Sequence, residues 1–184
     1  MGQDKAWLQF GPETMLERIV RILNEVAPLV VVVAATDQRL PDLPEHIEIT
    51  RDRMAGSGPL EGLRSGLAKL AGRTELAYVT SCDVPLLRPA FIRCVIELLG
   101  DAHAAVPYVN DRYQPLAGVY RTDIVPILDE LLHVNQLALH GIFSRIKVRM
   151  IDSSEFTGVD PELHSLLNLN DPAAYANALK IAGF

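Results

Sequence analysis

Apolar and polar residues alternate along this chain with two different periods, which predict helices and strands in turn. A helix is predicted from Thr14 to about Glu25, because Thr14 and Glu17 have the spacing of a capping box. The residues that give this helix one apolar face are Met15, Ile19, Ile22 and Leu23. Residues 29–34 then form an apolar, β-branched run typical of a buried parallel strand, and residues 47–50 predict a shorter one.

The same alternation continues to the end of the chain. Helices are predicted at residues 58–70, 89–99, 122–133 and 136–145, with a last helix that Asp171 and Pro172 begin. Strands are predicted at residues 76–80, 103–107, 114–120 and 147–151, with an extended segment at 166–169. The pattern predicts an α/β fold in a single domain, residues 1–184, with a mostly parallel central sheet that helices cover on both faces.

Composition narrows the class of protein without identifying an activity. The 184 residues are 49% apolar and 22% charged, the balance of a globular protein with a substantial core. The net charge is −6, which argues against general binding to nucleic acid. No apolar run approaches the roughly 20 residues of a membrane-spanning helix, and Asp4 and Glu13 argue against a signal peptide. We therefore expect a cytoplasmic protein that binds neither nucleic acid nor membranes.

The cysteines and histidines carry little recognisable chemistry. Cys82 and Cys94 form no Cys-x-x-Cys motif, so reduced core thiols are the favoured interpretation, and a more specialised role stays open. The five histidines show no metal-ligand spacing, and we expect no zinc site.

Asp83 is the sharpest candidate for a functional residue. Ligands of parallel sheets bind beyond the C-terminal ends of the strands, and Asp83 follows the predicted strand at 76–80. A carboxylate fixed there suits Mg²⁺, which takes one or two protein carboxylates and leaves other positions to phosphate and water. The alternative is that Asp83 caps the helix that begins at Pro89, although six residues is far for a cap.

A glycine-rich stretch follows Asp52. Four glycines stand within eleven residues: Gly56, Gly58, Gly62 and Gly66. The first turn of the predicted helix there contains Pro59 and Leu60, and its free N–H groups can hold an anion or a polar base edge. Tight packing against a neighbouring element explains Gly62 and Gly66 equally well.

Four more polar residues have both a functional and a simpler interpretation. Lys5 can neutralise a phosphate, or it is an ordinary solvated lysine. Gln114 can contact a substrate, or it merely follows an Asn-Asp turn. Asn168 and Asn170 are two apart in an extended segment and so point to the same side, where they can hydrogen-bond a phosphate or a pterin. Helix capping explains Asp171 but leaves Asn168 unexplained.

Taken in chain order, these segments resemble the molybdenum cofactor guanylyltransferases. That family belongs to the nucleotidyltransferases with a Rossmann-like three-layer fold. The matching segments are residues 1–5 (MGQDK), 58–63 (GPLEGL), 82–87 (CDVPLL), 114–116 (QPL) and 168–170 (NLN). They spread over nearly the whole chain, and the second and third together are more specific than any single segment.

The resemblance implies an enzyme that binds GTP and Mg²⁺ at the strand ends. In that family the terminal phosphate of molybdenum-molybdopterin attacks the α-phosphorus of GTP, pyrophosphate leaves, and the guanine dinucleotide cofactor forms. By position, Lys5 and Asp83 are then the catalytic residues, with Lys5 at the GTP phosphates and Asp83 holding the metal. The nucleotide- and cofactor-binding residues that the resemblance implies are Lys5, Asp52, Gly58, Pro59, Leu60, Gln114, Asn168 and Asn170, the last two on the pterin side.

The resemblance also implies partners. They are GTP and molybdenum-molybdopterin as substrates, and molybdoenzymes or their chaperones as recipients of the product. We expect the protein to act as a monomer.

The chain departs from the family pattern at its start. The family has an apolar strand, a Leu-Ala-Gly-Gly loop and an Arg ahead of the Met-Gly segment, whereas here Met1 is the first residue. We therefore expect one central strand and part of the nucleotide loop to be missing, with an assigned start at an internal methionine as the favoured explanation.

Two other functions stay open. One is a related transferase that uses CTP, for a cytosine dinucleotide or a sugar or isoprenoid phosphate, and the other is an inactive relative that binds the cofactor.

Overall fold

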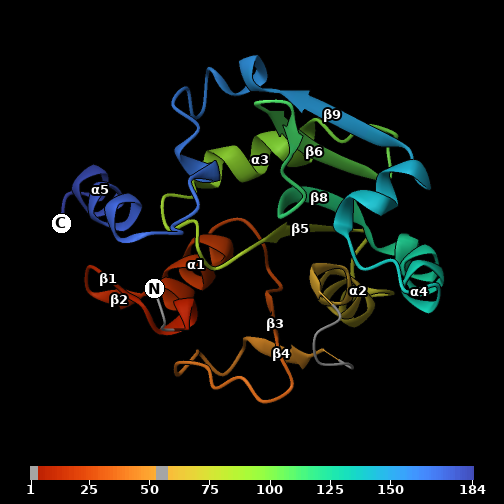
Figure 1. Ribbon diagram of the computed structural model, residues 1–184, viewed down its shortest axis with the longest axis horizontal. Helices are drawn as coiled ribbons and strands as arrows, with labels where there is room; N and C mark the ends of the chain where they lie inside the picture. The colour runs from red at the N-terminus through yellow and green to blue at the C-terminus, as the bar shows by residue number, and fades with distance from the viewer. Residues whose placement is uncertain (1–3, 53–57) are drawn as a thin grey trace.

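A five-stranded sheet lies at the centre of the molecule, beside a separate pair of parallel strands (Figure 1). The computed structural model describes residues 4–52 and 58–184. The strands of the larger sheet are β5 (Leu76–Thr80), β6 (Ala104–Val109), β7 (Arg112–Tyr113), β8 (Ala117–Arg121) and β9 (Val148–Asp152). The remaining strands are the parallel pair β3 (Val31–Ala34) and β4 (Glu48–Arg51), and the hairpin β1 (Gln9–Phe10) and β2 (Glu13–Thr14).

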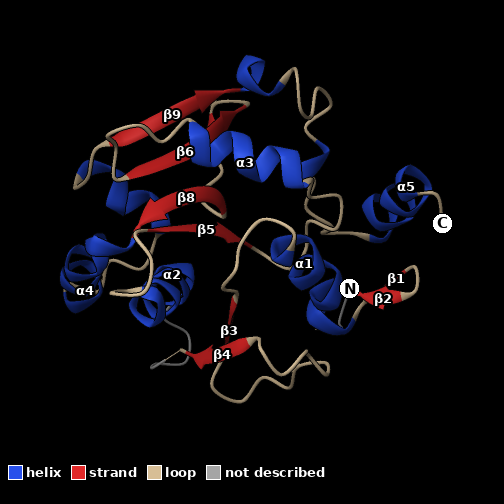
Figure 2. Cartoon of the chain, turned by 180° about the vertical axis from the view of Figure 1, so that it is seen from behind, coloured by secondary structure: helices blue, strands red, loops and turns tan. Residues whose placement is uncertain are grey.

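Helices cover both faces of the larger sheet, which gives the three layers that the sequence predicts. The helices concerned are α1 (Met15–Asn24), α2 (Gly58–Leu70), α3 (Pro89–Glu97) and α4 (Val125–His133). α1 and α3 share one apolar core with the sheet, and α2 and α4 share the other. The fully buried β6 residues Ala104, Ala105 and Val106 alternate between these two cores. Figure 2 shows α2 and α4 side by side and α3 lying across β6.

The larger sheet is mixed, which corrects the prediction of a mostly parallel central sheet. β8 runs antiparallel to both β5 and β6, and only β9 pairs with β6 in parallel. The cause is the connection between β6 and β8, residues 110–116. Parallel neighbours need a crossover of about a dozen residues or more, and this connection is too short for one. β7 also pairs back onto β6 within the connection, so the chain returns antiparallel.

Three local predictions are corrected as well. Residues 136–145 do not form an α-helix but contain the 3₁₀ helix η3 (Leu139–Ser144). Asn135, with a φ of 57°, follows the end of α4, and Gly141 lowers the helix propensity of the next segment. Residues 114–116 form a turn in which the Ala117 N–H donates to the Gln114 carbonyl oxygen at 3.0 Å, so the strand begins only at Ala117. The extended segment at 166–169 begins one residue late, because η5 (His164–Leu166) includes its first residue.

The predicted helix starts are confirmed where capping chemistry determines them. The Glu17 N–H donates to the Thr14 hydroxyl at 3.3 Å, and the Thr14 N–H donates to the Glu17 carboxylate at 2.6 Å, which completes the capping box. The Asp171 carboxylate caps α5 (Pro172–Ala182) by accepting from the Ala174 N–H at 2.8 Å. No helix within residues 4–52 and 58–184 is long and apolar enough to cross a membrane.

Candidate active site

Lys5 and Asp83 meet at the end of β5. The Lys5 Nζ atom lies 2.7 Å from Asp83 Oδ2, and it also donates to the Asn170 Oδ1 atom at 2.8 Å. The Lys5 side chain is 33% exposed and the Asp83 side chain 15%, so this ion pair is partly shielded from solvent. Three residues that the sequence singles out separately, from opposite ends and the middle of the chain, are therefore in direct contact.

Asp4 fixes the segment that carries Lys5. The Ala6 N–H donates to Asp4 Oδ1 at 3.0 Å and so caps the short 3₁₀ helix η1 (Lys5–Trp7). The Gln38 amide donates to the other oxygen of the same carboxylate at 2.8 Å. These two bonds tie the start of η1 to the loop after β3 and leave the Lys5 side chain directed at Asp83.

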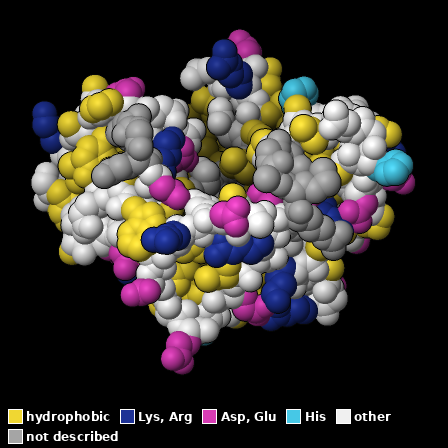
Figure 3. Space-filling view, turned by 60° about the horizontal axis from the view of Figure 1, so that its bottom comes forward, with side chains coloured by type: hydrophobic (Ala, Val, Ile, Leu, Met, Phe, Trp, Pro, Cys, Tyr) yellow, Lys and Arg dark blue, Asp and Glu magenta, His cyan; other side chains and the backbone are white. Residues whose placement is uncertain are grey.

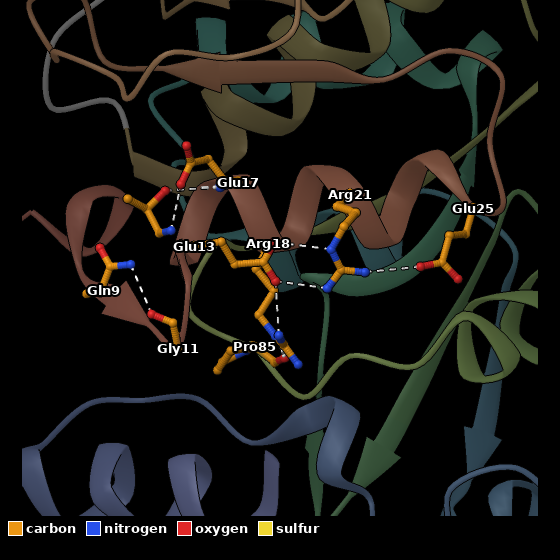
Figure 4. A network of polar contacts seen from close by, with 9 residues as sticks. Gln9, Gly11, Glu13, Glu17, Arg18, Arg21, Glu25 and Pro85 are labelled. Atoms are coloured by element: carbon orange, nitrogen blue, oxygen red, sulfur yellow. Dashed lines mark hydrogen bonds and ion pairs between the residues drawn. The ribbon is translucent and has the colours of Figure 1, made fainter. Parts of the chain in front are cut away.

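The segment that carries Asp83 is held from two sides. The Ser81 hydroxyl donates to Asp83 Oδ1, and the Leu169 N–H donates to the Asp83 carbonyl oxygen at 2.9 Å. The second bond places residues 168–170 directly beside Asp83. On the other side Arg18 of α1 donates to the Pro85 carbonyl oxygen at 2.6 Å (Figure 4).

A charged network on α1 orients Arg18. The Glu13 carboxylate accepts from Arg18 at 3.0 Å and from Arg21 at 2.9 Å, and Arg21 also reaches Glu25 at 3.2 Å (Figure 4). The hydrogen bond from Arg21 is the main reason that the pKa of Glu13 is lowered. Glu13 therefore stays ionised over most of the pH range and keeps Arg18 pointed at the chain that follows Asp83.

A cavity of about 760 Å³ opens beside Asp83, and we call it the Asp83 cleft. The polar and charged residues that line it are Ser81, Asp83, Arg112, Gln114, His140, Ser165, Asn168 and Asn170. Its lining therefore includes all three amide residues that the sequence predicts as cofactor-binding. They come from the turn before β8 and from the segment before α5, which the Leu169 bond holds against Asp83.

A second cavity, of about 340 Å³, lies between β3 and β5, and we call it the inter-sheet cavity. Apolar residues of both strands and of α1 and α2 line most of it. Within the described residues β3 pairs only with β4 and β5 only with β8, so the strand edges at this cavity have unpaired backbone groups. Figure 3 shows hydrophobic side chains in the hollowed centre of a face that includes the bottom of Figure 1.

Asp52 lines the inter-sheet cavity together with Gly58, Pro59 and Gly62. Its Oδ1 atom is buried and accepts no hydrogen bond from any residue in the ranges 4–52 and 58–184. Burial, and next the nearby Glu61 carboxylate, raise the pKa of Asp52. A buried acceptor without a donor is costly, and a ligand that brings a donor removes that cost.

The two cavities adjoin at the end of β5. Pro59, Ser81 and Leu116 line both of them, and Asp83 lies two positions after Ser81. A molecule in one cavity can therefore reach a molecule in the other beside the Lys5–Asp83 pair.

Some predicted residues lie elsewhere. Leu60 is fully buried in the core that α2 shares with α4, and it is not among the residues that line either cavity. Asp52 lines the inter-sheet cavity, not the Asp83 cleft. Gly56 and the residues before Asp4 lie outside the described residues.

Sequence reasoning missed several residues of the Asp83 cleft, among them Ser81, Tyr113 and His140. Ser81 stands two positions before Asp83, just after the same strand. Its closeness to Asp83 in the sequence could have indicated that it belongs to the site. Tyr113 stands next to Gln114 and reaches the cleft because of the β6–β7 hairpin. His140 lies on η3, and nothing in its local sequence indicates that this segment folds over the cleft.

The donor atoms at Asp83 suit Mg²⁺. They are one carboxylate and the Ser81 hydroxyl, a set that leaves most positions of an oxygen-loving ion to phosphate and water. Within the part of the chain that the structure describes, no three His, Cys, Asp or Glu side chains cluster as metal ligands. Cys82 is a free thiol, and burial raises its pKa to about 11, so it is protonated at neutral pH.

The sequence matches one family over most of its length. Residues 1–146 fit the model of the MobA-like NTP transferase domain. The chain is 32% identical over 182 residues to a probable molybdenum cofactor guanylyltransferase of Carboxydothermus hydrogenoformans, a match that covers 98% of this chain and 89% of that relative. It is 28% identical over 170 residues to the molybdenum cofactor guanylyltransferase of Desulfosudis oleivorans, which covers 92% and 82% of the two chains.

Two solved structures share the fold at low sequence identity. Molybdopterin-guanine dinucleotide biosynthesis protein A of Archaeoglobus fulgidus superposes with a TM-score of 0.78 at 19% identity, covering 99% of this chain and 92% of that one. 2-C-methyl-D-erythritol 4-phosphate cytidylyltransferase of Thermus thermophilus superposes with a TM-score of 0.75 at 16% identity, covering 98% and 94%. Both show that this α/β fold is the fold of nucleotidyltransferases.

Proposed function

This chain belongs to the MobA-like NTP transferase family, and on that premise we propose that it is a molybdenum cofactor guanylyltransferase. It transfers GMP from GTP to the terminal phosphate of molybdenum-molybdopterin and releases pyrophosphate. We propose further that it acts as a monomer and that molybdoenzymes or their chaperones take up the product.

One observation carries this proposal: Lys5, Asp83 and Asn170 are in contact where two cavities adjoin. A group transfer brings two substrates together, and the two cavities give each substrate a place. The charged groups that phosphate chemistry needs lie at their junction. The amides line the Asp83 cleft, whereas the Asp52 Oδ1 atom, which has no partner among the described residues, lies at the inter-sheet cavity.

The two substrates divide between the cavities by their hydrogen-bonding chemistry. The guanosine of GTP brings N–H and O–H donors, and Asp52 Oδ1 at the inter-sheet cavity lacks a donor among the described residues. Gly58 and Pro59 begin α2 beside it, where free N–H groups favour polar or anionic atoms. The acceptor then occupies the Asp83 cleft, where Gln114, Asn168 and Asn170 supply amides for a pterin edge or a phosphate.

The transfer itself requires positioning and charge neutralisation more than covalent help from the protein. An oxygen of the acceptor phosphate attacks the α-phosphorus of GTP, and the bond from that phosphorus to the pyrophosphate oxygen breaks. Lys5 is exposed enough to exchange its contact with Asp83 for a phosphate oxygen. Mg²⁺, held by Asp83 and Ser81, supplies further neutralisation of phosphate charge when it is bound.

Nucleotide preference tests the choice of GTP. The fold is shared with a cytidylyltransferase, so CTP is the competing nucleotide. GTP with Mg²⁺ is expected to raise the melting temperature more than CTP with Mg²⁺, because a ligand that binds only the folded state stabilises it. A larger shift with CTP contradicts the guanylyltransferase assignment.

Asp83→Ala tests the site. We expect it to reduce pyrophosphate release from GTP and molybdenum-molybdopterin by about a hundredfold or more, with little change in melting temperature. The matched control is Asp101→Asn, which also breaks a lysine–aspartate pair, with Lys147 at 2.6 Å, but lines neither cavity. An Asp83→Ala protein with an unchanged rate overturns the role of this carboxylate, and a wild-type protein without any release overturns the proposed activity.

A further inference from the structure

Three aromatic rings meet at the Asp83 cleft, and the proposed catalytic residues do not account for them. The Tyr113 ring lies 5.0 Å from the Tyr108 ring and 4.7 Å from the Phe143 ring, measured between centroids. Tyr113 lines the cleft and is 38% exposed, so part of its ring is open to a ligand although it contacts two other rings. The three rings come from β7, β6 and η3, so the tertiary fold assembles this cluster.

Hydrogen bonds on both sides of Tyr113 define the path of its backbone. β6 and β7 form a tight hairpin in which Tyr108 pairs with Tyr113, and the turn residues Asn110 and Asp111 have φ values of 52° and 58°. The Gln114 N–H donates to the Pro107 carbonyl oxygen at 2.8 Å directly after this hairpin. A partly exposed ring on a hydrogen-bonded hairpin, in contact with two other rings, is already oriented for a ligand.

We propose that Tyr113 is the stacking platform for the planar pterin ring of the acceptor, a substrate-positioning role that rests on the proposed function. Tyr113 lines the Asp83 cleft and is not among the residues that line the inter-sheet cavity, which places it with the acceptor and not with the guanine of GTP. A pterin stacked there has the amides of Gln114 and Asn168 in the same cleft for its polar edge.

The polar and charged side chains along the cleft fit the rest of the acceptor. Arg112 precedes Tyr113 and lines the cleft, as does His140, while Lys5 and Asp83 lie at the junction with the inter-sheet cavity. A molecule with a flat ring and a phosphate can therefore place its ring at Tyr113 and its phosphate toward Lys5. Stacking on Tyr113 fixes the distance between ring and phosphate and so selects a pterin phosphate over a phosphate without a ring.

Steady-state kinetics of three variants test this inference. Tyr113→Ala is expected to raise KM for molybdenum-molybdopterin about tenfold, from the strength of aromatic stacking, while KM for GTP stays unchanged. Tyr113→Phe keeps the ring and is expected to retain the wild-type KM values. Met150→Ala, which removes an exposed apolar side chain that lines neither cavity, is the control. An unchanged KM for the acceptor in Tyr113→Ala, or an equal rise in both KM values, overturns the inference.

Direct binding separates this inference from the proposed reaction. A fluorescent pterin monophosphate is titrated into each protein, and ring stacking is expected to quench its fluorescence with wild type and Tyr113→Phe but not with Tyr113→Ala. Quenching through Tyr113 without pyrophosphate release in the wild type refutes the transfer reaction and retains the stacking site. Normal transfer with equal pterin binding by Tyr113→Ala refutes the stacking site alone, and a wild type that neither binds nor transfers refutes both.

Discussion

The Asp83 cleft and the inter-sheet cavity adjoin at the end of β5, yet their polar groups are organised in opposite ways. In the cleft the polar groups at Asp83 already have partners, since Lys5 contacts both Asp83 and Asn170, and Ser81 donates to Asp83. At the inter-sheet cavity the Asp52 Oδ1 atom and the Tyr78 hydroxyl are buried, and neither has a partner among the described residues. The groups at Asp83 therefore bond to one another without a ligand, whereas the inter-sheet cavity has buried polar atoms that lack a partner among the described residues.

The difference matters for what a ligand does in each region. A substrate that enters the cleft must replace existing bonds, so its binding energy is a difference between two sets of contacts. A group that enters the inter-sheet cavity supplies donors and apolar contacts that are otherwise missing, so its binding adds to the stability of the fold. We therefore expect changes in the cleft to alter rate, and changes at the inter-sheet cavity to alter stability as well as binding.

The largest expected effect on rate comes from Lys5. Lys5→Met removes the cation where the two cavities adjoin. We expect it to lower the rate of pyrophosphate release by about a hundredfold or more, because the loss of one pre-positioned group that stabilises transition-state charge has an effect of that size. The melting temperature should change little, since the ion pair that is lost is partly exposed. Lys147→Met breaks the exposed pair with Asp101 and is expected to leave the rate within about twofold. If the rate falls because the Lys5→Met protein unfolds, the role of Lys5 is to stabilise the fold and not to catalyse the transfer.

An added strand probes the inter-sheet cavity. β3 and β5 each have an edge at the cavity that pairs with no described strand, and the family pattern includes an apolar strand and a Leu-Ala-Gly-Gly loop with an Arg. A chain extended by such a segment is expected to melt several degrees higher, at about 2–4 °C for each kcal/mol gained, and to bind GTP more tightly.

A Gly-Ser extension of equal length is the control for this experiment, because it has no apolar side chains to bury. Both melting temperatures are read from the same calorimetric scan protocol. Equal values for the two extensions mean that the cavity does not accept a strand.

The elements of the fold were predictable from the sequence wherever local chemistry decides them. The capping box of Thr14 and Glu17 and the Asp171 cap appear as expected. The direction of β8 was not predicted, although the six residues between the predicted strands at 103–107 and 114–120 were too few for a helical crossover. Periodicity therefore predicts that a strand exists, whereas its direction depends on the length of the connection.

The residues of the candidate site were likewise predictable only in part. Asp83 was found from its place after an apolar strand. Lys5 and Asn170 each had a functional and a simpler interpretation, and the family resemblance favoured the functional one. Lys5 contacts both Asp83 and Asn170. Tyr113 and His140 were missed, because their presence in the cleft depends on how a hairpin and η3 fold over it. No local pattern encodes such a contact between distant segments.

Asp52 couples ligand binding to stability at the inter-sheet cavity. Asp52→Asn is expected to weaken GTP binding about tenfold, because the charged acceptor for guanosine donors is lost. The same substitution should raise the melting temperature at pH 7. Burial raises the Asp52 pKa above its ordinary value of 3.8, so the folded state favours the neutral form, and wild-type stability falls as pH rises through the ionisation range.

The sign of this effect can be checked by melting both proteins from pH 3 to pH 8. The advantage of Asp52→Asn should vanish at low pH, where the wild-type carboxyl is protonated. Asp101→Asn is the opposite case, because the hydrogen bond from Lys147 lowers the Asp101 pKa, and this variant should lose a little stability at pH 7. A wild type that is more stable than Asp52→Asn at pH 7 means that Asp52 has a donor in solution.

The smallest expected effect compares the hydroxyl groups of two tyrosines, Tyr78 and Tyr120. Within the described residues the Tyr78 hydroxyl has no hydrogen-bond partner, whereas the Tyr120 hydroxyl donates to the Pro115 carbonyl oxygen at 2.8 Å. Tyr120→Phe is expected to lower the free energy of unfolding by about 1 kcal/mol, because it removes that bond. Tyr78→Phe is expected to leave it unchanged or to raise it by about 1 kcal/mol, because it removes a desolvated hydroxyl that forms no bond. Urea unfolding with equal m-values measures both changes on one scale. Equal losses in the two variants mean that the Tyr78 hydroxyl finds a partner in solution, and the inter-sheet cavity is then as well satisfied as the Asp83 cleft.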